Sequence, residues 1–296
     1  MISRRLTMAI SVVALVGLSS ATWAQQTKTT AQKGQSSKQQ TETPTLEGIL
    51  QRLQENVDQY QALVPSFFCD EHVVASMGNQ YRVGVNLTVT DSNFRLKRVP
   101  NPDGTITLQE SHEVKKVNGR PATGDSVSGP AFLRGAFSNG LALVSANQQA
   151  CMRTTIKPIR QNKPSDPITI QFASVPASER PDDCLMQEDI SGRVFIDPAT
   201  MQIRRMEFHA PNHVIAPESK TSQGVRIPSA VGTWDVTVEY APVVLGGESF
   251  WLPTKTSETM IDRIGTNEWL YDAAYRNYHK LEVTSRILPA SETPVP

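Results

Sequence analysis

The sequence predicts a mainly β (α+β) domain in which an antiparallel sheet has one face covered by an N-terminal helix and one or two further short helices. Three observations predict this class. Apolar residues recur first at helical spacing and then at a period of two, and turn-forming residues separate the strand-like segments. Many strands and few helices are typical of an antiparallel sheet with one covered face.

The first element expected is a helix that begins near Thr43-Pro44 and ends before Pro65. A Thr cap followed by proline at the first helical position is a common helix start. One apolar stripe then faces a Gln/Glu/Arg/Asp side. Its members are Leu46, Ile49, Leu50, Leu53, Val57, Tyr60 and Leu63.

After this helix the apolar period becomes two, which predicts half-buried strands. The two most regular apolar faces are Tyr81, Val83, Val85, Leu87 and Val89, and Trp234, Val236, Val238 and Tyr240. Less regular strands are expected at 66–75, 93–99, 106–117, 150–157, 167–174, 184–196, 201–209, 249–260 and 268–287. The turns expected between strands include Asn118-Gly119 and Gly246-Gly247.

Two segments do not follow this strand pattern. Residues 129–147 are expected to be helical or irregular, and 211–232 to be a long loop or lid, because it has no periodicity and contains three prolines. Near the C-terminus, Trp269, Tyr271 and Tyr275 share one face of a strand, and Tyr278 is expected to face the other side.

The N-terminus predicts export to the periplasm or secretion. Residues 1–24 combine two arginines, an apolar run and a small-residue exit at Ala24, which is typical of a cleaved signal peptide. Residues 25–43 predict a disordered polar linker, 44–288 a single domain, and 289–296 a frayed tail. No later segment is apolar for long enough to predict a spanning helix in the mature chain.

Charge and cysteine content narrow the expected partners and cross-links. Lys+Arg and Asp+Glu balance at 29 each, so no overall field favours nucleic acid. In an oxidising compartment one pair among Cys69, Cys151 and Cys184 is expected to bridge. Three pairings are open, of which Cys151–Cys184 is favoured because both lie in neighbouring strand-like segments, leaving Cys69 as a buried thiol.

No motif indicates a catalytic centre or a cofactor. The only enzyme alternative is a metal-dependent hydrolase with ligands near Asp70 and His72, which share one face of a strand while Glu71 points away. His209 and His213 are four apart, but Pro211 between them prevents a helix that would bring them together. The sequence predicts no catalytic, cofactor or metal residues.

Several short runs resemble the outer-membrane lipoprotein carrier superfamily, which includes periplasmic lipoprotein carriers and a sensor of mislocalised lipoproteins. The hairpin Gly192–Pro198 and Met201–Met206 carries most of the likeness. Further matching runs are Val238–Tyr240, Phe250–Pro253 and Tyr275–Tyr278. Cys69–His72 and Glu113–Gly119 resemble a branch of secreted bacterial proteins.

The resemblance implies a strongly curved antiparallel sheet, an unclosed barrel, that wraps around the helices. An apolar cavity between the sheet and the helices would take an acyl chain. The predicted function is a non-catalytic exported module that binds an acyl chain or a lipidated polypeptide; the alternative is a solid-cored structural protein that binds another envelope protein. If the cavity exists, its expected wall is formed by Leu53, Val57, Val83, Val85, Leu87, Trp234, Val236 and Val238.

Overall fold

The computed structural model describes residues 45–79, 85–123, 135–137, 140–157, 165–216, 219–220, 226–227, 229–263 and 267–281. These residues all lie in the second of two compact units, Pro44–Pro296. The predicted signal peptide 1–24, the linker 25–43, the tail 289–296 and Val83 lie outside the described residues.

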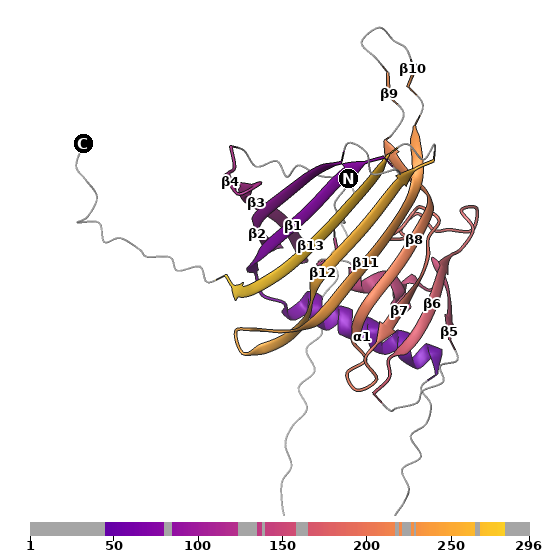
Figure 1. Ribbon diagram of the computed structural model, residues 1–296. Helices are drawn as coiled ribbons and strands as arrows, with labels where there is room; N and C mark the ends of the chain where they lie inside the picture. Colours follow the sequence, from indigo (N-terminus) through magenta and orange to yellow (C-terminus); the bar gives the residue numbers. More distant parts are fainter. Residues whose placement is uncertain are drawn as a thin grey trace, which may run out of the picture. The chain divides into compact units, whose positions relative to one another are not determined.

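The fold is mainly β and is built around one antiparallel sheet of eleven strands, as predicted. The strand order is β4-β3-β2-β1-β13-β12-β11-β8-β7-β6-β5, so the sheet does not close and β4 and β5 form its edges (Figure 1). The strands are β1 Phe67–Gly78, β2 Asn86–Pro100, β3 Ile106–Val117, β4 Arg120–Pro121, β5 Met152–Ile156, β6 Ile168–Ser174, β7 Ser191–Ile196, β8 Ile203–Ala216, β11 Ala230–Leu245, β12 Glu248–Asp262 and β13 Glu268–Lys280.

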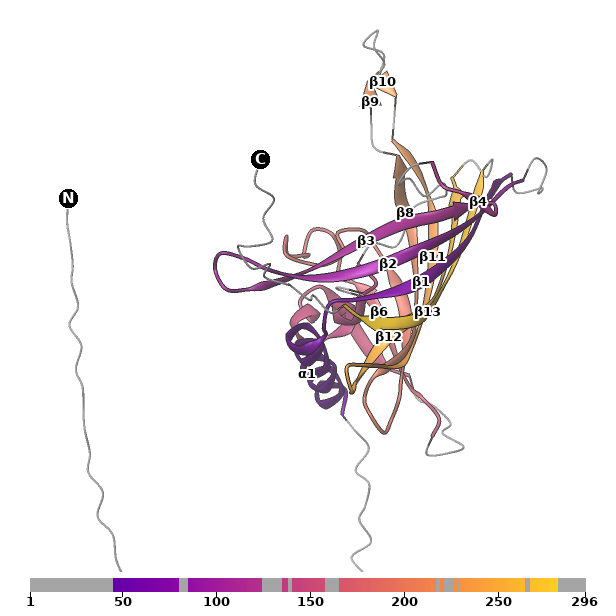
Figure 2. The ribbon, with the colours of Figure 1, turned by 90° about the vertical axis from the view of Figure 1, so that its left-hand side faces the viewer.

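The helix α1, Leu46–Leu63, lies on the concave side of this sheet (Figure 2). Its cap differs from the prediction: the side chain of Thr45, not Thr43, accepts a hydrogen bond from the N–H of Gly48 at 3.2 Å. The apolar stripe is confirmed, and its buried members include Ile49, Leu50, Leu53, Val57 and Tyr60. Each fully buried aliphatic side chain of this kind contributes about 1.5–3 kcal/mol to folding.

Two hydrophobic clusters fill the concave side and α1 belongs to both. Its N-terminal half, with Leu50 and Leu53, packs with residues of β6, β7, β8 and β11. Its C-terminal half, with Tyr60, packs with residues of β1, β2, β12 and β13. The 3-10 helices η1, Gly140–Val144, and η2, Ala146–Gln148, add Leu143 and Val144 to the first cluster. They fall in the segment predicted to be helical or irregular.

The predicted turns at Asn118-Gly119 and Gly246-Gly247 are confirmed. All four residues have positive φ, between 49° and 92°. Two-residue hairpin loops need this conformation at both positions because it matches the twist of the flanking strands, and Asn and Gly adopt it most easily.

The face of β2 that is buried differs from the prediction. Thr90, Ser92 and Phe94 are buried, whereas Val85 and Leu87 are 45% and 58% exposed. The register with β1 explains this, because Thr90 lies opposite the buried Val73, and side chains that are directly opposite share a face. The alternating apolar residues Val85 and Leu87 therefore lie on the exposed side at this end of the strand.

Residues 211–232 are not one long loop. β8 continues to Ala216, and β11 begins at Ala230. Between them β9, Ser219–Lys220, pairs with β10, Arg226–Ile227, in a hairpin that extends beyond the sheet away from α1 (Figures 1 and 2). Pro211 is accommodated inside β8 because the register with β11 shifts there, and a bulge does not require the N–H that proline lacks.

Tyr278 faces the same side as Tyr275, contrary to the strand alternation. The register between β1 and β13 shifts between Phe68 and Asp70, and Asn277 opposite this shift has a φ of 54°. The extra residue on β13 reverses the alternation. Tyr278 therefore packs against the ring of Phe67 at 5.7 Å between centroids.

Candidate functional site

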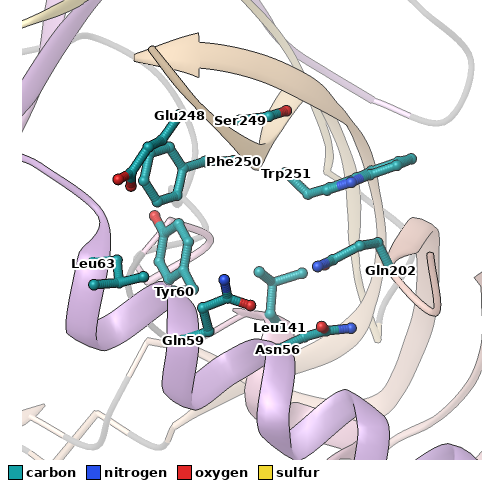
Figure 3. Close-up of a pocket in the computed structure, with 10 residues that line it drawn as sticks. All are labelled: Asn56, Gln59, Tyr60, Leu63, Leu141, Gln202, Glu248, Ser249, Phe250 and Trp251. Carbon is teal, nitrogen blue, oxygen red and sulfur yellow. The ribbon is translucent and has the colours of Figure 1, made fainter. Parts of the chain in front are cut away.

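A cleft of about 330 Å³ opens between the C-terminal half of α1 and the start of β12 (Figure 3). Helical spacing brings four α1 residues to one side of it, since positions three, four and seven apart share a face. Leu141 comes from η1, Gln202 from the β7–β8 turn, and the rest from β12. The lining residues are Asn56, Gln59, Tyr60, Leu63, Leu141, Gln202, Glu248, Ser249, Phe250 and Trp251.

The cleft lies where the two hydrophobic clusters meet. Tyr60 and Phe250 belong to the second cluster, Trp251 packs against the first, and Leu141 contacts both. Leu63 at the lip is 51% exposed. Five of the ten lining residues are apolar or aromatic and five are polar, and the volume exceeds the value of about 300 Å³ from which small-molecule sites usually begin.

Two buried tyrosine hydroxyls interact in this region, and of the two residues only Tyr60 lines the cleft. Tyr60 points from α1 towards β12 (Figure 3), and Tyr240 on β11 lies close enough to interact with it electrostatically. Both residues are less than a tenth exposed, and neither hydroxyl has a hydrogen-bond partner within the described part of the chain. Burial, reinforced by the carboxylate of Glu110, raises the pKa of both tyrosines far above the ordinary value of 10, so both stay protonated.

Glu110 on β3 fixes a neighbouring turn. Its two carboxylate oxygens accept the backbone N–H groups of Gly135 at 3.0 Å and Phe137 at 3.1 Å. This turn places the ring of Phe137 on that of Phe94, 4.1 Å between centroids. The sequence does not reveal this role, because nothing local connects Glu110 to a turn 25 residues later.

A band of buried polar groups crosses the concave wall beyond the cleft. The buried Glu71 on β1 pairs with His112 on β3, 2.8 Å from Oε2 to Nδ1. The indole N–H of Trp234 donates to the buried Glu258 at 3.0 Å. A cavity of about 10 Å³, the size of one water, lies among these groups. Its lining residues are Phe94, Glu110, His112, Phe137, Thr256, Glu258, Tyr271 and Tyr275.

The predicted cavity wall lies elsewhere than the cleft. Leu53, Trp234, Val236 and Val238 are buried in the first hydrophobic cluster, and Val57 is also buried. Val85 and Leu87 are exposed. None of these seven residues lines the cleft, which lies one helical turn further along α1. That they line a cavity stays a prediction.

The metal candidates are held by separate partners. Asp70 accepts a hydrogen bond from Asn277 at 2.7 Å, and His72 pairs with Asp91 at 2.7 Å. His209 pairs with Asp235 and His213 with Glu188. No group of three or more His, Cys, Asp or Glu among the residues described here is arranged to hold a metal ion.

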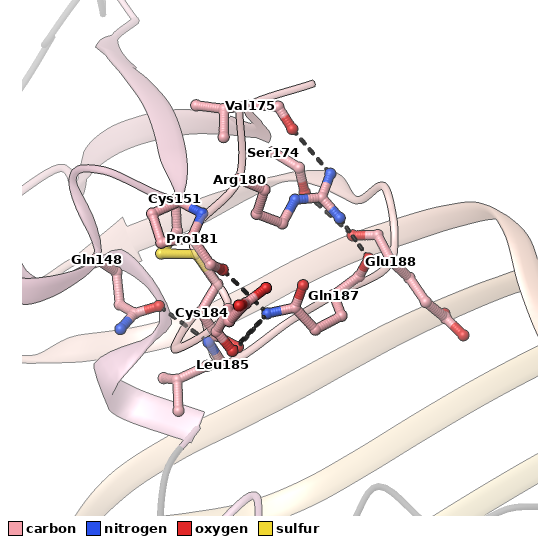
Figure 4. Close-up of a disulfide and its surroundings, with 11 residues drawn as sticks. Gln148, Cys151, Ser174, Val175, Arg180, Pro181, Cys184, Leu185, Gln187 and Glu188 are labelled. Carbon is pink, nitrogen blue, oxygen red and sulfur yellow. Dashed lines mark hydrogen bonds between the residues drawn. A yellow bond between two sulfur atoms is a disulfide. The ribbon is translucent and has the colours of Figure 1, made fainter. Parts of the chain in front are cut away.

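The predicted disulfide Cys151–Cys184 is present, and Cys69 is a buried free thiol. The bond ties residues 175–190, here called the disulfide loop, to the start of β5 (Figure 4). Inside this loop the buried Arg180 donates to the carbonyls of Gln187 and Val175 and to Asp189. The side-chain amide of Gln187 donates to three further carbonyls, those of Pro181, Asp182 and Cys184.

No protein-family model matches the chain, and no curated protein is significantly similar to it. Among solved structures, it is similar to an outer membrane lipoprotein-sorting protein domain from Vibrio parahaemolyticus (11% identity, 79% of this chain and 92% of that one, TM-score 0.33). It is also similar to a LolA superfamily protein from Nitrosomonas europaea (15% identity, 83% of this chain and 96% of that one, TM-score 0.31). A third similar structure is that of a DUF1329 family protein from Desulfovibrio piger (10% identity, 79% of this chain and 95% of that one, TM-score 0.34).

Two of these three structures carry the name of the superfamily that the sequence resembles. At these identities and TM-scores the likeness supports no argument about function. The described residues contain no helix that is long and apolar enough to cross a membrane. Function is therefore argued from the cleft.

Proposed function

We propose that the protein is a non-catalytic exported module that binds an acyl chain, free or carried by a polypeptide, in the cleft between α1 and β12. The observation that carries the proposal is the cleft itself. It places Tyr60, Leu141, Phe250 and Trp251 at the junction of two hydrophobic clusters, beside polar side chains that include Glu248 and Gln202.

Burial of a chain in this cleft provides the driving force. Each methylene group removed from water contributes about 0.8 kcal/mol. Leu53 and Val57 lie on α1 next to the cleft-lining residues, and Leu53 belongs to the same hydrophobic cluster as Trp234, Val236 and Val238. In the proposal, a small shift of α1 lengthens the cleft towards these residues for a longer chain.

Export to the periplasm or beyond is part of the same proposal. Residues 1–24 support it, because they combine positive charge, an apolar run and small residues at the expected cleavage site. The disulfide Cys151–Cys184 fits an oxidising compartment, where such bonds persist.

Native mass spectrometry of protein purified from its own cell envelope tests the proposal. We expect a co-purifying acylated molecule on the wild-type chain and a several-fold lower occupancy on Leu63→Asp, which places a charge at the lip of the cleft. Val244→Asp is the matched control, because Val244 is also an exposed aliphatic residue, at 68%, but does not line the cleft. Absence of any bound acyl group, or equal occupancy in both variants, would contradict acyl binding in this cleft.

A second candidate function is binding to another envelope protein through the β9–β10 hairpin. The observation that favours it is the position of this hairpin, which extends beyond the sheet at the ends of β8 and β11 (Figure 1). Cross-linking in cells, with and without residues 217–228, tests it. Loss of specific adducts after the deletion supports this function, and unchanged adducts argue against it.

A further inference from the structure

The two tyrosine hydroxyls in the region of the cleft lack the partners that buried polar groups normally have. Nearly all buried hydroxyls in native proteins find a hydrogen-bond partner, and an exception calls for an explanation. Those of Tyr60 and Tyr240 have none within the described residues, although both tyrosines are at least nine-tenths buried. Phenylalanine would fill the same space without leaving a polar group unsatisfied.

The hydroxyl of Tyr60 can serve a bound molecule because Tyr60 belongs to the cleft lining. Its ring points towards Phe250 (Figure 3). Tyr240 lies near it, on the inner face of β11. Both groups remain protonated and can donate an O–H, so the complementary ligand atom is a hydrogen-bond acceptor.

We propose that the cleft selects acyl chains linked through an ester or amide, whose carbonyl oxygen accepts a hydrogen bond from the hydroxyl of Tyr60. The inference rests on the proposed function and specifies its ligand class. Acylglycerols and lipidated polypeptides both carry such a carbonyl, whereas free fatty acids carry a carboxylate.

Binding of matched probes below their micelle concentrations tests this, with isothermal titration calorimetry as the readout. The probes are monododecanoylglycerol and its ether analogue dodecylglycerol, which lacks only the carbonyl. We expect the ester to bind about 3- to 10-fold more tightly than the ether, which corresponds to about one net hydrogen bond.

The variant Tyr60→Phe should reduce the preference for the ester over the ether and leave ether binding unchanged. Tyr278→Phe is the control, because its hydroxyl donates to the carbonyl of Pro253 and does not line the cleft. Thermal unfolding of each variant shows whether it folds. A neutral N-dodecanoyl dipeptide amide distinguishes the two sources: tighter binding than the glycerol ester indicates a lipidated polypeptide, and weaker binding an acylglycerol.

The outcomes separate the two levels of the proposal. Equal affinity for ester and ether, or an ester preference that survives Tyr60→Phe, would overturn the carbonyl inference and leave acyl binding in place. Failure of all the probes to bind would overturn the proposed function and the inference together.

Discussion

The disulfide loop and the cleft both bury polar side chains beside the same hydrophobic core, but they satisfy them differently. In the disulfide loop, the terminal nitrogens of Arg180 bond two carbonyls and Asp189, so that only its Nε lacks a partner among the residues described, and the Gln187 amide reaches three more carbonyls. At the cleft, the single polar atom of the Tyr60 side chain has no hydrogen-bond partner among those residues. The first arrangement stabilises the fold, and the second suits a site that another molecule completes.

Removing the covalent bond of the disulfide loop should have the largest effect on stability. The double variant Cys151→Ala/Cys184→Ala opens a cross-link between residues 33 apart in sequence. Loop-closure entropy predicts a loss of about 3–4 kcal/mol in the free energy of unfolding. Urea unfolding measures it. Because the cleft is formed by other elements, affinity for the dodecanoyl ester should stay within about 2-fold at temperatures where the variant is folded.

A loss of ester binding in the folded double variant would show that the two regions are coupled. An unchanged free energy of unfolding would show that the bond does not stabilise the loop in solution.

Arg180→Leu should have the next largest effect. The side chain of Arg180 is 2% exposed, so its removal leaves the carbonyls of Gln187 and Val175 without their donor. We expect a loss of about 2–4 kcal/mol by urea unfolding. Arg153→Leu is the control, since its ion pair with Glu179 is exposed and should change stability by less than about 0.5 kcal/mol. Similar losses in the two variants would contradict the structural role of Arg180.

The β7–β8 turn gives a smaller, pH-dependent effect. Burial would raise the pKa of Asp197, but hydrogen bonds from Thr200, Arg204 and Ala199 outweigh it and hold the pKa below its ordinary value of 3.8. Because the folded pKa is depressed, the stabilisation is complete above the unfolded value and is lost as pH falls below it towards the folded value. Unfolding measured from about pH 5 to pH 2 should therefore show a steeper loss for wild type than for Asp197→Asn. Parallel pH curves would exclude this role.

Local elements of the fold could be predicted from the sequence, and long-range register could not. The stripe of α1, the bounds of β3 and the Gly246-Gly247 turn follow from periodicity and turn chemistry within a few residues. The pairing of β1 with β13 joins segments about 200 residues apart, and its bulge at Asn277 reverses the side of Tyr278. No local pattern encodes such a shift.

The site was harder to predict than the fold. The sequence analysis searched for apolar walls, so it selected Leu53 and Val236, which are buried in the first hydrophobic cluster and do not line the cleft. The cleft depends on gaps between elements and on a hydroxyl left without a partner, and neither leaves a pattern in the sequence. Tyr60 was predicted correctly as a stripe residue, but its unpartnered hydroxyl is visible only once α1 is placed against β11 and β12.

Thermal unfolding of Tyr60→Phe with and without the dodecanoyl ester tests the ligand role of the cleft hydroxyl most directly. Without ligand, we expect the variant to be as stable as wild type or more stable by up to about 1 kcal/mol, because a buried unsatisfied hydroxyl is removed. With ligand, its gain in stability should be smaller than that of wild type. A variant that is clearly destabilised alone and gains as much from the ester as wild type would show that the hydroxyl supports the fold, as Arg180 does, and not a ligand.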